Sequence, residues 1–204
     1  MKKILFYTSF VLFFVIAFTI YAIAGCKNHH SGYPYEEISY PTPNIEPDTL
    51  NDVQGVVLHH TAIQTAKKAL KTLSSPEKKV STHVVIDYDG TRYIMAAPTD
   101  VTWHAGRSIL GDREDCNFFT IGIEFQGNTL EKPLTTDQIN SAIEYLLPLI
   151  RQYRIPMENI VTHEMVRKAY KEKYPDSKVY DKCDITQTEY HRFIKALEKE
   201  MDSH

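Results

Sequence analysis

The sequence predicts an α/β (α+β) fold, a single domain in which helices flank a central mixed β-sheet. Short runs rich in Val and Ile have the length of strands, and one pair of them is joined by Asp89-Gly90. Two longer stretches repeat apolar residues at the period of an amphipathic helix. The 204 residues suffice for one domain with a sizeable core, so a second folded domain is not expected.

The first predicted elements lie before residue 97. Val56-Val57-Leu58 is consistent with a buried strand whose end presents His59 and His60. Residues 66–73 have helical character. The segment 81–96, STHVVIDYDGTRYIMA, predicts two strands of a hairpin, because Asp-Gly between alternating runs is a strong turn signal.

The later elements are one more strand and two helices. The strand is 120–125, TIGIEF. Thr135 to Gln138 resembles a capping box, and a helix is expected to follow and to kink or end near Pro148. Its apolar face is Ile139, Ile143, Leu146, Leu147 and Ile150, and that of the last helix is Tyr190, Phe193, Ile194, Leu197 and Met201.

The N-terminus indicates export. Residues 1–25 combine a Lys-containing start with an apolar run, as in a signal peptide, and the run ends in Ile-Ala-Gly before Cys26. This ending looks like the lipobox of bacterial lipoproteins, in which the Cys is lipidated. An uncleaved membrane helix is the alternative, since about 20 apolar residues can span a bilayer. Residues 26–52 are rich in Pro, Ser and Asn and are expected to be a lipidated tether to a domain at 53–204.

Charge and cysteine content exclude some classes of partner. A formal net charge of -3 gives no broad basic field, so a nucleic-acid partner is not expected. Outside the cytoplasm the remaining Cys116 and Cys183 could form a disulfide, which the sequence alone does not decide.

Histidines are the candidate metal ligands, but no local motif joins them. His163-Glu164 begins like the HExxH zinc motif, and Arg167 stands where the second His is required. A metal site would therefore draw its ligands from distant segments, and buried, hydrogen-bonded histidines are the alternative.

Six segments together resemble a known family. VVLHHTA, VSTHVVIDYDG, TWHAG, CNFFTIGIEFQG, VTHE and KCD occur in the order and approximate spacing of zinc-dependent N-acetylmuramoyl-L-alanine amidases of the second amidase family. These share their fold with phage amidase lysozymes and peptidoglycan-recognition proteins. The resemblance covers residue 53 to about residue 197, so it implies an amidase-like fold for nearly the whole predicted domain.

The resemblance implies a zinc ion held by His59, His163 and Asp184. The third ligand has Cys183 as its alternative, because family members use Asp or Cys there. Two His and one carboxylate leave the fourth position of a tetrahedral Zn²⁺ open, as a catalytic site requires. His60 follows the first ligand and is expected to be a packing or rim residue.

The remaining motif residues imply catalytic and substrate-binding roles. Glu124 aligns with the family's general base, and Lys182 would stabilise the oxyanion on the attacked carbonyl. The alternatives are a strand-edge salt bridge for Glu124 and an ordinary solvated charge for Lys182. The substrate-binding candidates are His83, which could orient a ligand or substrate, and Trp103, His104 and Asn117 on the rim of the groove.

The implied reaction is hydrolysis of the amide between N-acetylmuramic acid and L-alanine in peptidoglycan or its fragments. Zinc would polarise the carbonyl and acidify a water. We expect a monomer, lipid-anchored on the non-cytoplasmic side in the bacterial cell envelope, periplasmic or at the outer membrane. The rivals are a peptidoglycan-binding lipoprotein of the same fold without activity and an interaction protein.

Overall fold

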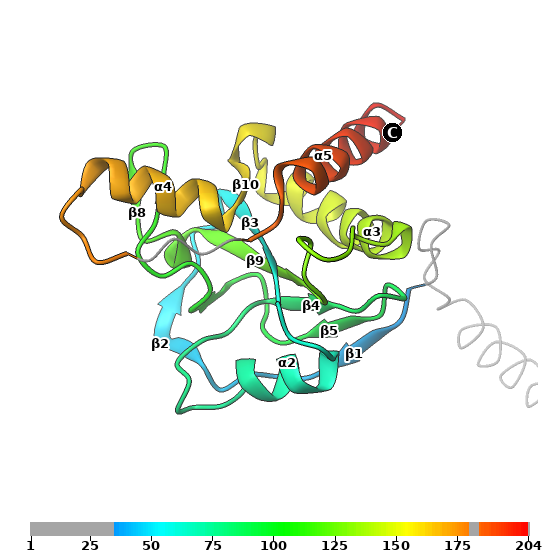
Figure 1. Ribbon diagram of the computed structural model, residues 1–204, viewed down its shortest axis with the longest axis horizontal. Helices are drawn as coiled ribbons and strands as arrows, with labels where there is room; N and C mark the ends of the chain where they lie inside the picture. The colour runs from blue at the N-terminus through cyan, green and yellow to red at the C-terminus, as the bar shows by residue number, and fades with distance from the viewer. Residues whose placement is uncertain (1–34, 180–183, 204) are drawn as a thin grey trace, which may run out of the picture. The chain divides into compact units, whose positions relative to one another are not determined.

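A computed structural model describes residues 35–179 and 184–203. A six-stranded mixed sheet forms the centre of this part (Figure 1), in the order β1-β5-β4-β9-β3-β10. All neighbouring strands pair in parallel except β4 and β5. The strands are β1 (Glu37–Ser39), β3 (Gly55–His60), β4 (Val84–Ile86), β5 (Arg92–Ile94), β9 (Thr120–Phe125) and β10 (Ile160–Thr162). The predicted fold class is confirmed.

The two central strands are buried along their whole length. Every residue of β3 and β9 is buried, because both faces of the sheet are covered. The apolar runs GVVL and TIGI suit this environment, whereas the ends of the strands carry His59, His60 and Glu124. Three buried polar side chains therefore lie at the carboxyl ends of the two central strands.

Helices α3 (Thr136–Tyr153) and α5 (Gln187–Asp202) cover one face of the sheet, and both were predicted (Figure 1). Phe125 of β9 meets Phe193 of α5 with ring centroids 6.0 Å apart. The predicted capping box at the start of α3 is present. The helix does not end at Pro148 but continues to Tyr153; Pro148 is exposed, where water can solvate the carbonyl that its ring leaves without a donor.

The other face carries shorter elements. The predicted helix α2 (Ala66–Leu73) packs Leu70 and Leu73 on Val85 of the sheet. Helix α4 (His163–Lys173) begins directly after β10 and buries Val166. Two small sheets and one short 3-10 helix complete this side: β2 (Ile45–Leu50) with β6 (Asp100–Thr102), β7 (Ile109–Leu110) with β8 (Arg113–Glu114), and η1 (Cys116–Phe118). A second 3-10 helix, η2 (Met157–Asn159), packs Met157 against the core that α3 and α5 cover.

The predicted hairpin joins β4 and β5. The two strands pair antiparallel, and Gly90 in the turn has φ 85°, a left-handed conformation that glycine adopts without strain. Asp89 supports the turn by accepting a hydrogen bond from the Thr91 amide at 3.0 Å. The sequence signal is therefore confirmed by both strand pairing and turn geometry.

The prediction of a tether up to residue 52 is wrong for residues 35–52. These residues belong to the compact unit that starts at Tyr35, and they include β1 and β2. Asn44 fixes the connection, since its buried side-chain amide donates to the carbonyls of Leu73, Ser75 and Val80. Prolines suggested a linker, but proline is also tolerated at the edges of sheets.

The remaining predictions about the N-terminus lie outside the described residues. These are the signal peptide at 1–25, the lipidation of Cys26 and the tether from 26 to 34. Among the described helices, none is sufficiently long and apolar to cross a membrane.

Candidate metal centre

Three side chains from distant segments form a buried cluster at the carboxyl ends of strands β3 and β10. His59 lies near the end of β3, His163 is the first residue of α4, and Asp184 precedes α5. Strands β3 and β10 run parallel with Leu58 opposite Thr162, so the residues that follow them emerge side by side. One potential ligand atom from each of the three lies within 4.8 Å of the others.

Asp184 is oriented by the backbone. Its Oδ1 accepts hydrogen bonds from the amides of His60 at 2.7 Å and Ile185 at 3.1 Å. Its Oδ2 lies 3.1 Å from Nδ1 of His163 and 3.5 Å from Nδ1 of His59. Burial alone would raise the pKa of this carboxyl group, but the two histidines outweigh it and hold the pKa well below the usual value. Asp184 is therefore a carboxylate whose Oδ2 faces the imidazoles.

The ring of His163 has a defined orientation. Its Nε2 lies 3.0 Å from the carbonyl oxygen of Ala105, which can only accept a hydrogen bond. Nε2 therefore carries a proton, and Nδ1 is the ring nitrogen that faces Asp184. A backbone carbonyl in this position is the usual second partner of a metal-binding histidine.

The donor set suits a zinc ion. Two imidazole nitrogens and one carboxylate oxygen converge in a site where all three residues are buried. Lone pairs and negative charge directed at one point repel each other unless a cation lies between them. Three protein ligands that leave a fourth position open are characteristic of catalytic rather than structural zinc.

Glu124 lies beside this cluster. Strand β9 pairs with β3 so that Glu124 is directly opposite His59, and residues in register on neighbouring strands project from the same face. The side chain is buried, with 8% of its surface exposed. Burying a carboxylate is costly without a partner or a function, and this position is next to His59 of the cluster.

His60 faces away from His59, as alternation along a strand requires. Its Nδ1 accepts a hydrogen bond from the amide of Thr129 at 3.2 Å. Its own amide holds Asp184. The prediction of a packing residue is confirmed, and the backbone of His60 also positions the cluster.

His83 does not contact the cleft. It is fully buried; Nδ1 accepts from the Gly122 amide at 2.9 Å, and Nε2 donates to the carbonyl of Asp100 at 3.0 Å. Burial lowers the pKa of His83 to about 4, against the opposing effect of Asp100. His83 is thus a neutral histidine that joins backbone segments, as in the alternative, and its role in orienting a ligand or substrate stays a prediction.

The Trp103 segment forms one wall of a cleft. Asn117 Oδ1 accepts from the amides of His104 at 3.0 Å and Ala105 at 2.7 Å, so it fixes the path of the segment. The half-buried Trp103 donates from Nε1 to Glu46 at 3.2 Å. Asn117 therefore shapes the cleft, whereas substrate contact by Trp103 or Asn117 stays a prediction.

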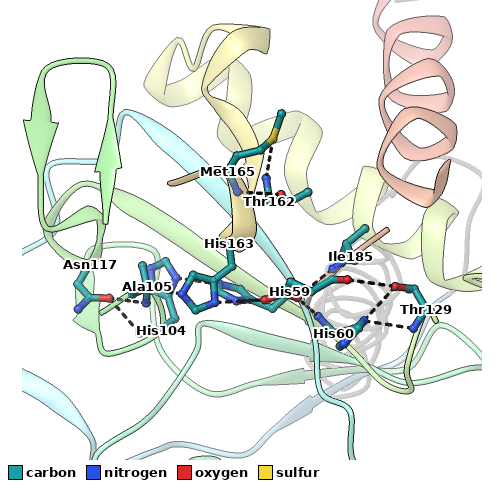
Figure 2. Close-up of polar contacts among 11 residues, drawn as sticks. His59, His60, His104, Ala105, Asn117, Thr129, Thr162, His163, Met165 and Ile185 are labelled. Atoms are coloured by element: carbon teal, nitrogen blue, oxygen red, sulfur yellow. Dashed lines mark hydrogen bonds and ion pairs between the residues drawn. The ribbon is translucent and has the colours of Figure 1, made fainter. Parts of the chain in front are cut away.

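His104 lines the cleft, where its contact with substrate stays a prediction, and it also contacts His59. Its Nδ1 lies 3.1 Å from Nε2 of His59, and its Nε2 lies 3.3 Å from Oγ1 of Thr120. Burial, followed by the neighbouring histidines, lowers the pKa of His104 well below its ordinary value. Both ring nitrogens thus face protein groups, and His104 is oriented toward His59 of the cluster (Figure 2).

The cleft has a volume of about 420 Å³ and reaches the cluster at His163. Four of the described residues that line it are basic and none is acidic. The sequence analysis missed these four residues, because Lys-rich and Arg-containing segments are usually solvated surface. The basic residues are Lys79, Arg107, Arg167 and Lys178.

Two residues of the predicted site receive no structural test. Lys182 and Cys183 lie outside the described residues, so the catalytic role of Lys182 and a disulfide between Cys116 and Cys183 stay predictions. Cys116 itself is a buried thiol, and burial raises its pKa to about 11. This is consistent with the expectation that Cys116 is not a nucleophile.

The mixed sheet with a cleft and a buried His-His-Asp cluster suggests a metal-dependent hydrolase. Residues 49–178 match the family described as N-acetylmuramoyl-L-alanine amidase. The chain belongs to this family. Asp184 lies beyond the matched range and is placed in the cluster by the structure.

Curated relatives include two types of amidase. Over 90 residues the chain is 38% identical to the 1,6-anhydro-N-acetylmuramyl-L-alanine amidase AmpD of Haemophilus influenzae, covering 43% of this chain and 47% of AmpD. Over 166 residues it is 26% identical to the N-acetylmuramoyl-L-alanine amidase AmiD of Escherichia coli, covering 74% of this chain and 59% of AmiD. The chain thus spans about half the length of the curated relatives that it matches.

Solved structures support the same fold. The crystal structure of an AmpD derivative superimposes with a TM-score of 0.60 and 21% identity, covering 83% of this chain and 97% of AmpD. AmiD from E. coli in complex with anhydro-N-acetylmuramic acid-L-Ala-D-gamma-Glu-L-Lys gives a TM-score of 0.51 and 23% identity, covering 59% of this chain and 52% of AmiD.

Proposed function

We propose that the protein hydrolyses the amide between N-acetylmuramic acid and L-alanine in peptidoglycan or its fragments. The observation that carries the proposal is the buried cluster of His59, His163 and Asp184 with Glu124 in register beside it, in a chain of the amidase family. The relatives AmpD and AmiD are named for cleavage of this class of bond.

Each residue has a separate role in the proposed hydrolysis. The cluster would hold Zn²⁺, which supplies a Lewis acid for the scissile carbonyl and acidifies a water. Glu124 takes a proton from the attacking water onto its carboxylate and passes it to the leaving amine of L-alanine. Lys182 stabilises the negative charge that develops on the carbonyl oxygen.

The cleft supports a substrate that carries carboxylates. Lys79, Arg107, Arg167 and Lys178 line it, and none of the described lining residues is acidic. Stem peptides contain free carboxylates, as the tripeptide in the AmiD complex illustrates with its D-gamma-Glu residue. Trp103 at the same cleft offers an indole face for the sugar or peptide.

The location is part of the proposal. Residues 1–25 direct export, Cys26 is lipidated, and residues 27–34 link the lipid to a monomeric domain that begins at Tyr35. The anchor keeps the cleft near peptidoglycan at the non-cytoplasmic side of a membrane. If the exported mature protein stays soluble after cell fractionation, this part of the proposal is wrong.

The test uses residues 27–204 with anhydromuropeptides and intact peptidoglycan, and mass spectrometry of the products. Release of stem peptide with a free L-alanine amine, abolished by chelator and restored by Zn²⁺, is expected. His59→Ala and Glu124→Gln should abolish it, whereas His191→Ala and Glu198→Gln, at exposed positions of α5, should not. Bound but uncleaved fragments would instead support the non-catalytic binding protein.

A further inference from the structure

We propose that Thr120 and His104 are positioning residues, which fix the ring of His59 so that its Nδ1 faces the metal. The proposal rests on the zinc site in the proposed function. It concerns a hydrogen-bonded chain from a backbone carbonyl to a metal ligand, in which each proton position follows from the previous one.

The chain starts at the Thr120 hydroxyl. Thr120 is fully buried in β9, and its Oγ1 lies 2.6 Å from the carbonyl oxygen of Cys116. A carbonyl oxygen only accepts, so the single hydroxyl proton of Thr120 points to Cys116. Oγ1 is left as an acceptor for any other partner.

The next link is His104. Its Nε2 lies 3.3 Å from Oγ1 of Thr120, which as an acceptor requires the proton on Nε2. In a neutral imidazole the other nitrogen, Nδ1, is then an acceptor. Nδ1 of His104 lies 3.1 Å from Nε2 of His59, so Nε2 of His59 donates to it.

The last link is the ligand itself. With a proton on Nε2, His59 turns its Nδ1 toward Oδ2 of Asp184, 3.5 Å away. His163 reaches the same tautomer through the carbonyl of Ala105. The two histidines therefore present equivalent nitrogens, one oriented by a backbone carbonyl and the other through a second histidine.

The packing around His104 fits a positioning role. A Cβ on Gly122 would lie 2.7 Å from Cγ and 2.9 Å from Nδ1 of His104, so only glycine leaves room for this ring. His83 meets His104 edge to face, with ring centroids 5.9 Å apart. The ring of His104 is thus confined on the side of the sheet and on the side of His83.

The test compares two substitutions of Thr120 that differ in whether the hydroxyl is kept. Thr120→Val keeps the shape but removes the hydroxyl, and Thr120→Ser keeps the hydroxyl. Zinc affinity is measured by competition with a chromophoric chelator at fixed pH. Loss of a hydrogen-bonding group that orients a metal ligand lowers metal affinity about 10- to 100-fold. Thr120→Val should show this loss and Thr120→Ser should remain close to the wild type.

One further variant and two further measurements separate positioning from folding. Long-range ¹H–¹⁵N NMR of the metal-free protein reports the His59 tautomer, which should be Nε2–H in the wild type and mixed in Thr120→Val. Gly122→Ala, which displaces His104 without touching the hydroxyl, should also weaken zinc binding. Thermal unfolding of each metal-free variant shows whether the fold is retained.

The outcomes distinguish this inference from the proposed function. Wild-type zinc affinity and an unchanged His59 tautomer in folded Thr120→Val would overturn the inference and leave the amidase proposal intact. A wild-type protein that binds zinc without cleaving muropeptides would overturn the amidase proposal alone. A wild-type protein that binds no zinc would overturn both.

Discussion

Acid should destabilise this protein through His83, and the size of the effect follows from its surroundings. The pKa of His83 falls from 6.5 to about 4 because the ring is buried. Protonation of Nδ1 would also place an N–H against the Gly122 amide, which now donates to that nitrogen. The native state therefore resists a proton that the unfolded chain accepts.

The sign and magnitude can be worked out from this difference. Above pH 6.5 His83 is neutral in both states and stability does not depend on its titration. Between pH 6.5 and about 4 only the unfolded state binds the proton, so the free energy of unfolding falls as pH falls. A gap of about 2.5 pKa units at about 1.36 kcal/mol each gives a loss of about 3 kcal/mol.

The assay is urea unfolding of metal-free protein from pH 7.5 to pH 4, compared with His83→Asn. The Asn carbonyl can accept from Gly122 but does not titrate, and contributions from other histidines cancel in the comparison. The wild type should lose about 3 kcal/mol more than the variant across this range. Equal losses in the two proteins would refute the assignment of His83 as a neutral, internally bonded residue.

Three further predictions concern folding, metal and substrate. Asn44→Ala should lower the free energy of unfolding by about 1–3 kcal/mol in urea titrations, since its buried amide donates to three carbonyls; an unchanged midpoint would argue that residues 35–52 add no stability. Zinc at about 100 times its Kd should stabilise the wild type by about 2.7 kcal/mol in thermal unfolding, and chelator should reverse this, whereas His59→Ala should not respond. Arg107→Gln with Lys178→Gln should raise KM for muropeptides more than it lowers kcat, and equal kinetics with the surface control Lys199→Gln would contradict a role for the basic cleft.

The sequence predicted the elements whose signals are local. The buried strand before His59, the Asp89-Gly90 hairpin and the capped helix after Thr135 each depend on neighbouring residues, and each is confirmed. Strand β1 was missed because it has three residues and derives its stability from pairing with β5. A pairing partner more than 50 residues away leaves no trace in local composition.

The site was predictable as a set of residues but not as an arrangement. The family resemblance implied His59, His163 and Asp184, and the structure brings these three together. Their roles as ligands stay a proposal. The orientation of His104 could not be foreseen, because it depends on Thr120, whose hydroxyl looks like an ordinary strand residue in the sequence.

The order in which the chain folds limits when the metal cluster can exist. His59 and His163 become neighbours only after β3 and β10 pair, and these parallel strands are separated by about 100 residues of intervening chain. Such distant pairings form slowly, because long loops must close before any contact stabilises them. A newly made or partly unfolded chain therefore offers isolated histidines rather than a preformed cluster. Metal capture by these three side chains is a late event, which follows completion of the sheet.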